Sequence, residues 1–197
     1  MQRLVRVGLP VLALGVTLAI AAAASAIEIG AAGPAWKGLA GVDGKTHSLG
    51  ALKSAKAVVV CFTCNHCPVA VAYEDRLVKF VKDYKGKDVA LVAINVNNMD
   101  ADKLPAMKVR AKEKGFKFAY LYDPSQKIGR AYGARVTPHL FVLDGKRRVV
   151  YQGAFDDSMN AKKAQHHFAR DAVDAVLAGK SPTKTTTKPP GCTIKYE

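Results

Sequence analysis

The sequence has 197 residues, of which 49% are hydrophobic and 8% aromatic, and its formal net charge is +14. A chain of this length and composition can build one domain around a hydrophobic core, which excludes a disordered or a collagen-like protein. The Lys and Arg residues are scattered and do not form runs interleaved with aromatic residues. We therefore interpret the charge as a solvated cationic surface and expect no nucleic-acid partner.

The first 26 residues have the pattern of a secretory signal peptide. Arg3 and Arg6 precede an uncharged apolar run over residues 7–24, and Ala24-Ser25-Ala26 supplies the small residues of a cleavage site. The alternative is an uncleaved membrane anchor, because a run of this length just spans a bilayer. Any membrane contact is then confined to this segment. We expect cleavage after Ala26 and an exported protein, periplasmic or otherwise extracytoplasmic.

The first half of the remaining chain predicts a hairpin followed by a βαβ unit. Residues 27–52 contain Asp43-Gly44, a typical hairpin turn between two short strands. Ala57–Phe62 is a continuous apolar run of the kind found in buried parallel strands, and a second buried strand is predicted at Val89–Asn95. Apolar residues recur at helical spacing between them, which predicts a helix over residues 67–85. The crossover should be right-handed.

The next segment predicts two further helices around a strand. Asp102 is predicted to cap a helix that ends at Gly115, and residues 118–122 form a short strand. Asp123-Pro124 is predicted to open the following helix, which ends near Gly133, with Asp as the cap and Pro in the first helical position.

The last segments predict a hairpin, a helix and a tail. Residues 140–143 and 148–152 alternate around a turn, and residues 160–177 have helical periodicity. Residues 180–197 are rich in Lys, Thr and Pro, which cannot bury enough apolar surface to order themselves, so we expect a flexible tether with a terminal cysteine motif. The folded domain should span residues 27–179.

The chemistry of the chain centres on a C-x-x-C motif at the junction of a strand and a helix. Cys64 and Cys67 frame the motif, and the second cysteine opens the predicted helix, where unpaired N–H groups and the helix dipole stabilise a thiolate. His66, when protonated, adds positive charge. A disulfide across two residues opens and closes without large backbone movement, which suits electron exchange. The alternative interpretation is a buried structural disulfide.

Four motifs together resemble one branch of the thioredoxin superfamily. They are residues 29–36, residues 43–45, Cys64-Asn65-His66-Cys67-Pro68 and Val136-Thr137-Pro138. The chain is similar to peroxiredoxin-like proteins of the alkyl-hydroperoxide-reductase and thiol-specific-antioxidant type. This resemblance implies an α/β, thioredoxin-like fold with a central mixed sheet flanked by helices and an N-terminal β-hairpin extension. It also implies a cis-proline at Pro138 facing the dithiol.

We therefore predict an exported thiol–disulfide oxidoreductase that uses this dithiol. Cys64 would attack a partner disulfide and Cys67 would resolve the mixed disulfide. Thr137 and Pro138 would shape the substrate groove, and His66 would tune the thiolate. The expected partners are protein thiols and disulfides of the cell envelope, and no bound cofactor or metal is needed.

Two other functions remain open at this point. A peroxiredoxin-like thiol peroxidase would use Cys67 as its peroxidatic residue and peroxide as its substrate, although Val60 and Cys64 stand where that family has Pro and Thr. A copper(I)-binding chaperone similar to the Sco type would use the two thiols with His139. The C-x-x-C spacing is one residue shorter than the Sco motif.

The two remaining cysteines are candidate accessory thiols. Cys61 lies within an apolar strand, where a small buried hydrophobe is the commonest role and a functional third thiol is the alternative. Cys192 follows the predicted tether. It could reach the active site as a resolving thiol, or it could fix the tail by bonding to Cys61, and the sequence does not separate the two.

Overall fold

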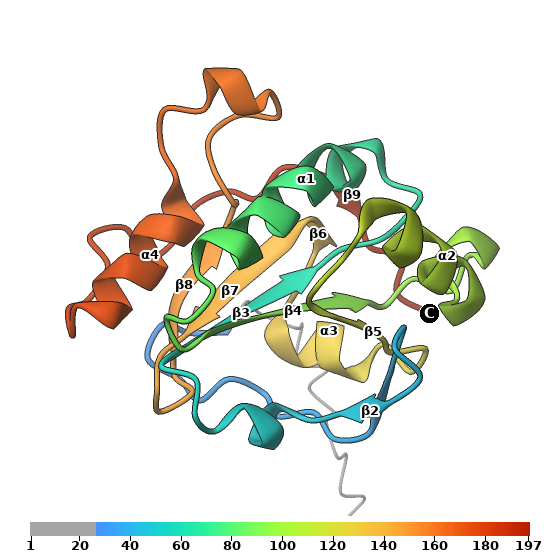
Figure 1. The fold of residues 1–197 in the computed structure, drawn as a ribbon, viewed down its shortest axis with the longest axis horizontal. Coiled ribbons are helices and arrows are strands. Elements are labelled where there is room, and N and C mark those ends of the chain that lie inside the picture. Colours follow the sequence, from blue (N-terminus) through green and yellow to red (C-terminus); the bar gives the residue numbers. More distant parts are fainter. Residues whose placement is uncertain (1–26) are drawn as a thin grey trace, which may run out of the picture.

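The structure, a computed structural model, describes residues 27–197; the predicted signal peptide lies outside the described residues. The described chain forms a seven-stranded mixed sheet in the order β2-β1-β5-β4-β3-β7-β8, with helices on both faces (Figure 1). Within this range no helix is long and apolar enough to cross a membrane. The predicted fold class, a thioredoxin-like α/β fold with a mixed sheet, is confirmed.

The centre of the sheet is made of the strands that the apolar runs predict. β3 (Ala57–Phe62) pairs in parallel with β4 (Val89–Asn95), and β4 pairs in parallel with β5 (Ala119–Tyr122). On its other side β3 pairs antiparallel with β7 (His139–Leu143), which pairs with β8 (Val149–Gly153). All six residues of β3 are buried, because helices cover both faces of this strand.

The N-terminal hairpin extends the sheet at the β5 edge. β1 (Leu39–Gly41) pairs antiparallel with β2 (Thr46–His47) and, on its other side, with β5. The backbone N–H of Gly41 donates to the carbonyl of Lys45 at 2.8 Å, which closes the turn around Asp43-Gly44. The predicted hairpin extension is confirmed.

Three helices cover one face of the sheet and one covers the other (Figure 1). α1 (Pro68–Asp83), α2 (Leu104–Lys114) and α4 (Phe168–Leu177) lie on the first face, and α3 (Lys127–Tyr132) lies on the second. Side chains of β3 alternate between the two faces: Ala57, Val59 and Cys61 pack with α1 and α4, while Val58, Val60 and Phe62 pack with residues of α3. This arrangement fixes the carboxyl end of β3 beside the start of α1.

The start of α2 differs from the prediction in a way that matters for the site. The helix begins at Leu104 with Lys103 as its cap, and Asp102 instead ends the short 3-10 turn Asp100–Asp102. Asp102 is completely buried and accepts hydrogen bonds from residues of the C-x-x-C segment. The carboxylate is therefore used by a neighbouring segment and does not cap its own helix.

Two other helices begin later than predicted. α3 begins at Lys127 after Gln126, because Asp123 folds a turn in which its carboxylate accepts from the backbone N–H of Ser125 and of Ile128. α4 begins at Phe168: residues 161–163 form a separate 3-10 turn, and Asp157 ties the intervening loop through the N–H of Gln165.

The C-terminal segment differs from the expected tether because backbone pairing holds it. The backbone N–H of Gln152 donates to the carbonyl of Thr185, and that of Thr187 donates back to Gln152. Further along, β9 (Cys192–Thr193) pairs antiparallel with β6 (Val136–Thr137). These contacts need no run of apolar residues, so the Lys, Thr and Pro composition did not reveal them.

Candidate redox site

The C-x-x-C segment lies where β3 ends and α1 begins. β3 ends at Phe62, and Cys67 is the cap residue of α1, whose first residue is Pro68. A proline fits this position because the first N–H groups of a helix have no partner within the helix. Cys67 is therefore held at the positive end of the α1 dipole, as the motif predicts.

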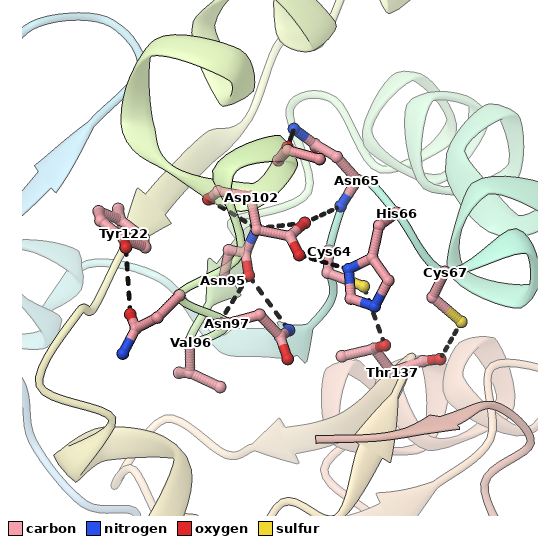
Figure 2. A network of polar contacts seen from close by, with 12 residues as sticks. Cys64, Asn65, His66, Cys67, Asn95, Val96, Asn97, Asp102, Tyr122 and Thr137 are labelled. Atoms are coloured by element: carbon pink, nitrogen blue, oxygen red, sulfur yellow. Dashed lines mark hydrogen bonds and ion pairs between the residues drawn. The ribbon is translucent and has the colours of Figure 1, made fainter. Parts of the chain in front are cut away.

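Thr137 stands between the two thiols (Figure 2). The Cys64 Sγ lies 3.1 Å from the Thr137 hydroxyl, and the Cys67 thiol donates to the Thr137 carbonyl at 3.3 Å. The peptide bond from Thr137 to Pro138 is cis, as the resemblance implied. The structure thus brings Cys64, Cys67, Thr137 and Pro138 together.

The surroundings of the two thiols act on them in opposite directions. Burial raises the pKa of Cys64 to about 12, and the negative charge of Asp102 adds to the rise, while the Thr137 hydroxyl opposes it. Burial also acts to raise the pKa of Cys67, but hydrogen bonds from the Cys192 thiol and from the backbone of Ala70 outweigh it, so this pKa is lowered. Cys67 is therefore the better thiolate, whereas the sequence-based hypothesis gave that role to Cys64.

Asp102 connects the C-x-x-C segment to the loop after β4 (Figure 2). Its carboxylate accepts from the backbone N–H of Asn65 at 2.7 Å and from the Asn95 side chain at 3.2 Å, and it forms a short contact with His66 Nδ1. Since Asp102 is fully buried and Asn95 is the last residue of β4, this network fixes the conformation of the motif.

Tyr120 completes the network from the neighbouring strand. Its hydroxyl donates to the Asn65 side chain at 2.9 Å and accepts from the Asn95 side chain at 3.3 Å. Sequence reasoning did not single out Asn95, Asp102 or Tyr120 as site residues. The available signal was position: Asn95 ends a strand parallel to β3 and Asp102 follows that strand, and the carboxyl ends of parallel strands meet at one edge.

His66 belongs to the only group of the described residues whose donor atoms could hold a metal ion together. The Cys64 sulfur, a His66 nitrogen and an Asp102 oxygen lie within 4.8 Å of one another. His139, which the copper hypothesis paired with the two thiols, is not in this group. It is buried in β7 against Phe141, and burial, aided by the charge of Arg135, lowers the pKa of His139 to about 4.

The accessory thiols lie in different environments. Cys61 is a residue of β3 whose side chain is completely buried under α1 and α4, and this burial raises its pKa to about 12. Cys192 is half-buried and packs against Cys67, so the contact with Cys61 that would fix the tail does not form. All four cysteines are thiols in the structure.

Comparisons with known proteins identify the family of the chain. The Redoxin family model matches residues 28–166. A hypothetical protein from Sinorhizobium meliloti 1021 is 37% identical, with a TM-score of 0.82, over 88% of this chain and 97% of that one. An uncharacterized conserved protein from Geobacillus kaustophilus is 35% identical, with a TM-score of 0.79, over 86% and 93% of the two chains.

A more distant structure shares the fold alone. A putative thiol:disulfide interchange protein DsbE from Chlorobium tepidum is 21% identical, with a TM-score of 0.60, over 78% of this chain and 98% of that one. The comparison with curated proteins finds no match. Because the Redoxin model covers most of the chain, the chain belongs to the Redoxin family, a branch of the thioredoxin superfamily. The protein is an oxidoreductase.

Proposed function

We propose that the protein is an exported thiol–disulfide oxidoreductase whose working dithiol is Cys64 and Cys67. The observation that carries the proposal is the position of both thiols on Thr137, one on its hydroxyl and one on its carbonyl, directly before the cis-proline. Two thiols held at one residue at a helix start are suited to form and open a disulfide.

The electrostatics favour Cys67 as the attacking thiolate. Its thiolate would attack one sulfur of a partner disulfide, and the other partner sulfur would leave with the electron pair and take up the proton that Cys67 lost. Cys64 would then attack the Cys67 sulfur, which releases the second partner sulfur as a thiol. The partner is reduced by two electrons and the Cys64–Cys67 pair is oxidised; the reverse direction uses the same steps.

The high pKa of Cys64 suits the resolving role. The raised pKa keeps Cys64 protonated until it is needed, and the carboxylate of Asp102 and the ring of His66, within 4.8 Å of its sulfur, are the nearby groups proposed to relay its proton. His66 therefore keeps a tuning role in the proposal, but it acts on Cys64 through Asp102.

The roles of the two cysteines are separated by a trapping experiment. Purified protein is reacted with an oxidised protein substrate, and mixed disulfides are mapped in Cys64→Ser and Cys67→Ser, with Cys61→Ala as the matched control. We expect Cys64→Ser to accumulate a mixed disulfide through Cys67 when Cys192 is also changed to Ser, and Cys67→Ser to form none. Accumulation through Cys64 in Cys67→Ser would restore the order predicted from the sequence, and full exchange in Cys67→Ser would contradict the proposal.

Peroxide reduction is a second candidate, because the lowered pKa of Cys67 is also what a peroxidatic cysteine needs. In this case Cys67 would attack peroxide and become a sulfenic acid. Turnover of hydrogen peroxide that is lost in Cys67→Ser and retained in Cys64→Ser would favour the peroxidase over the dithiol exchange.

Export is supported by the pattern of residues 1–26. Fractionation of cells that express the full chain, followed by N-terminal sequencing, tests this part. We expect a periplasmic or secreted protein that begins at Ile27. A cytoplasmic protein that still begins at Met1 would contradict export and leave the dithiol chemistry untouched.

A further inference from the structure

The C-terminal strand lies along the residue that binds both thiols. In the β6–β9 pair, Thr193 stands opposite Val136 and Cys192 stands opposite Thr137, and the backbone N–H of Ile194 donates to the carbonyl of Arg135 at 2.9 Å. Figure 1 shows β9 beside β6 and the start of α1. The chain thus adds its own end as a strand to the edge that leads into the cis-proline.

The pairing brings a third sulfur to Cys67. Cys192 packs against the small buried cluster of Cys64, Cys67 and Ala70, and its thiol acts to lower the pKa of Cys67. Cys67 thus lies in one cluster with Cys64 and Cys192. A partner sulfur that bonds to Cys67 would have to take the place that Cys192 now holds.

Gly191 allows this close approach. Its φ is +139°, and a Cβ built there would lie 2.1 Å from the Thr137 carbonyl oxygen. Beyond β9, Ile194 is buried and the Tyr196 hydroxyl donates to the Ala134 carbonyl at 2.7 Å. The tail is therefore seated in one register, with glycine at the tightest point.

With β9 in place, no large partner can reach the dithiol. Cys67 is 0% and Cys64 is 2% exposed, although both must meet a partner sulfur if the proposed function holds. β9, whose Cys192 packs against their cluster, is held by backbone hydrogen bonds, which any extended polypeptide can also make. A polypeptide that pairs with β6 would replace β9 without new side-chain contacts.

We propose, on the basis of the function proposed above, that the β6 edge binds an extended cysteine-containing segment of a protein partner and that β9 occupies this edge between turnovers. Cys192 is then a third redox residue. When β9 returns, the Cys192 thiol loses its proton and its sulfur attacks Cys67 in the mixed disulfide; the Cys67–Cys192 bond forms, and the partner sulfur leaves with the electron pair and takes up that proton. Return of the strand and release of the reduced partner are one event.

Gly191→Ala tests whether β9 covers the site. The added Cβ cannot be placed beside the Thr137 carbonyl, so the tail should leave the edge. We expect alkylation of Cys67 to be faster, on the order of tenfold, and the Cys67–Cys192 disulfide to be rarer by a similar factor after mild oxidation. Gly179→Ala is the matched control, because Gly179 also has a positive φ, +70°, but open space around it. Equal alkylation of Cys67 in wild type and Gly191→Ala would overturn the proposal.

Cys192→Ser tests the third redox residue with a nearly isosteric change. We expect the mixed disulfide on Cys67 to live longer, on the order of tenfold, with a protein substrate. Unchanged turnover in Cys192→Ser, together with a working Cys64–Cys67 couple, would overturn the role of Cys192 and leave the proposed function standing. Loss of any reversible couple at Cys67 in wild type would instead remove the proposed function itself.

A peptide tests the class of ligand. A linear peptide with the sequence of residues 187–197 and Ser at the cysteine position is added in excess to Gly191→Ala. We expect it to slow the reaction of Cys67 with a protein disulfide, because it competes for the β6 edge. No effect of this peptide at any concentration would show that the edge does not bind extended polypeptide.

Discussion

The buried carboxylate of Asp102 offers a direct test of how the site controls its thiols. Asp102→Asn keeps the size of the side chain and removes its negative charge. The charge of Asp102 contributes to the high pKa of Cys64, after burial, so its removal should lower that pKa. The pKa should nevertheless stay above the ordinary value of 9.0, because burial remains.

The size of the effect follows from the distance. The Cys64 sulfur and an Asp102 oxygen lie within 4.8 Å. At that distance and an effective dielectric constant of about 20, one charge contributes about 3.5 kcal/mol, or about 2.5 pKa units. His66 beside the carboxylate screens part of this, so we expect a fall of about 1–2 units. The lost acceptor should also lower the free energy of unfolding by about 1–3 kcal/mol.

The assay is the pH dependence of thiolate formation at Cys64, followed by ultraviolet absorbance in a Cys61→Ala background and by mapped alkylation. Asp100→Asn is the control, since the Asp100 side chain is 96% exposed and pairs only with Lys103. It should change neither the pKa of Cys64 nor, beyond about 0.5 kcal/mol, the stability. An unchanged pKa of Cys64 in Asp102→Asn would refute the electrostatic reasoning.

Three further predictions concern the core. The pKa of His139 is about 4 in the folded protein against an ordinary 6.5, so the unfolded chain binds more protons than the folded one below pH 6.5. Wild type should therefore lose up to about 3 kcal/mol of stability between pH 6.5 and 4 relative to His139→Gln, as measured by urea unfolding. Arg76→Met should lower the free energy of unfolding by about 3–5 kcal/mol, because the buried carboxylate of Asp156 loses its ion-pair partner at 2.7 Å. Lys79→Met removes the more exposed ion pair with Asp83 and should lower it by less than about 1 kcal/mol. Equal losses in the two variants would contradict this prediction. Cys61→Ala should lower the free energy of unfolding by about 1 kcal/mol and leave the rate of disulfide exchange unchanged. A loss of exchange in a variant that still folds would show that Cys61 is a functional thiol.

The strands that hold the site could be read from the sequence. The apolar runs of β3 and β4 begin and end at the predicted residues, because a strand buried on both faces needs apolar residues throughout and polar residues at its ends. The position of Cys67 at the helix start and the cis bond before Pro138 were also predicted. These features depend on local pattern or on the resemblance to a known fold.

The rest of the site depends on contacts between distant segments. Asp102 has the local signature of a helix cap, and only the fold shows that its carboxylate turns to Asn65 and His66. The proposed order of the thiols depends on this charge and on Cys192, and neither contact is visible in the motif, which by itself favours Cys64 as the attacking thiol. The tail docks by backbone pairing, which composition does not record.

The most direct test of the account is a redox titration of the protein from Ile27 onward against glutathione buffers, with thiol trapping and mapping of the cysteine pairs. The account predicts one reversible two-electron couple that always includes Cys67, paired with Cys64 or with Cys192, while Cys61 stays a thiol throughout. Four cysteines that remain thiols at every potential, or a reversible couple that leaves Cys67 free, would contradict it.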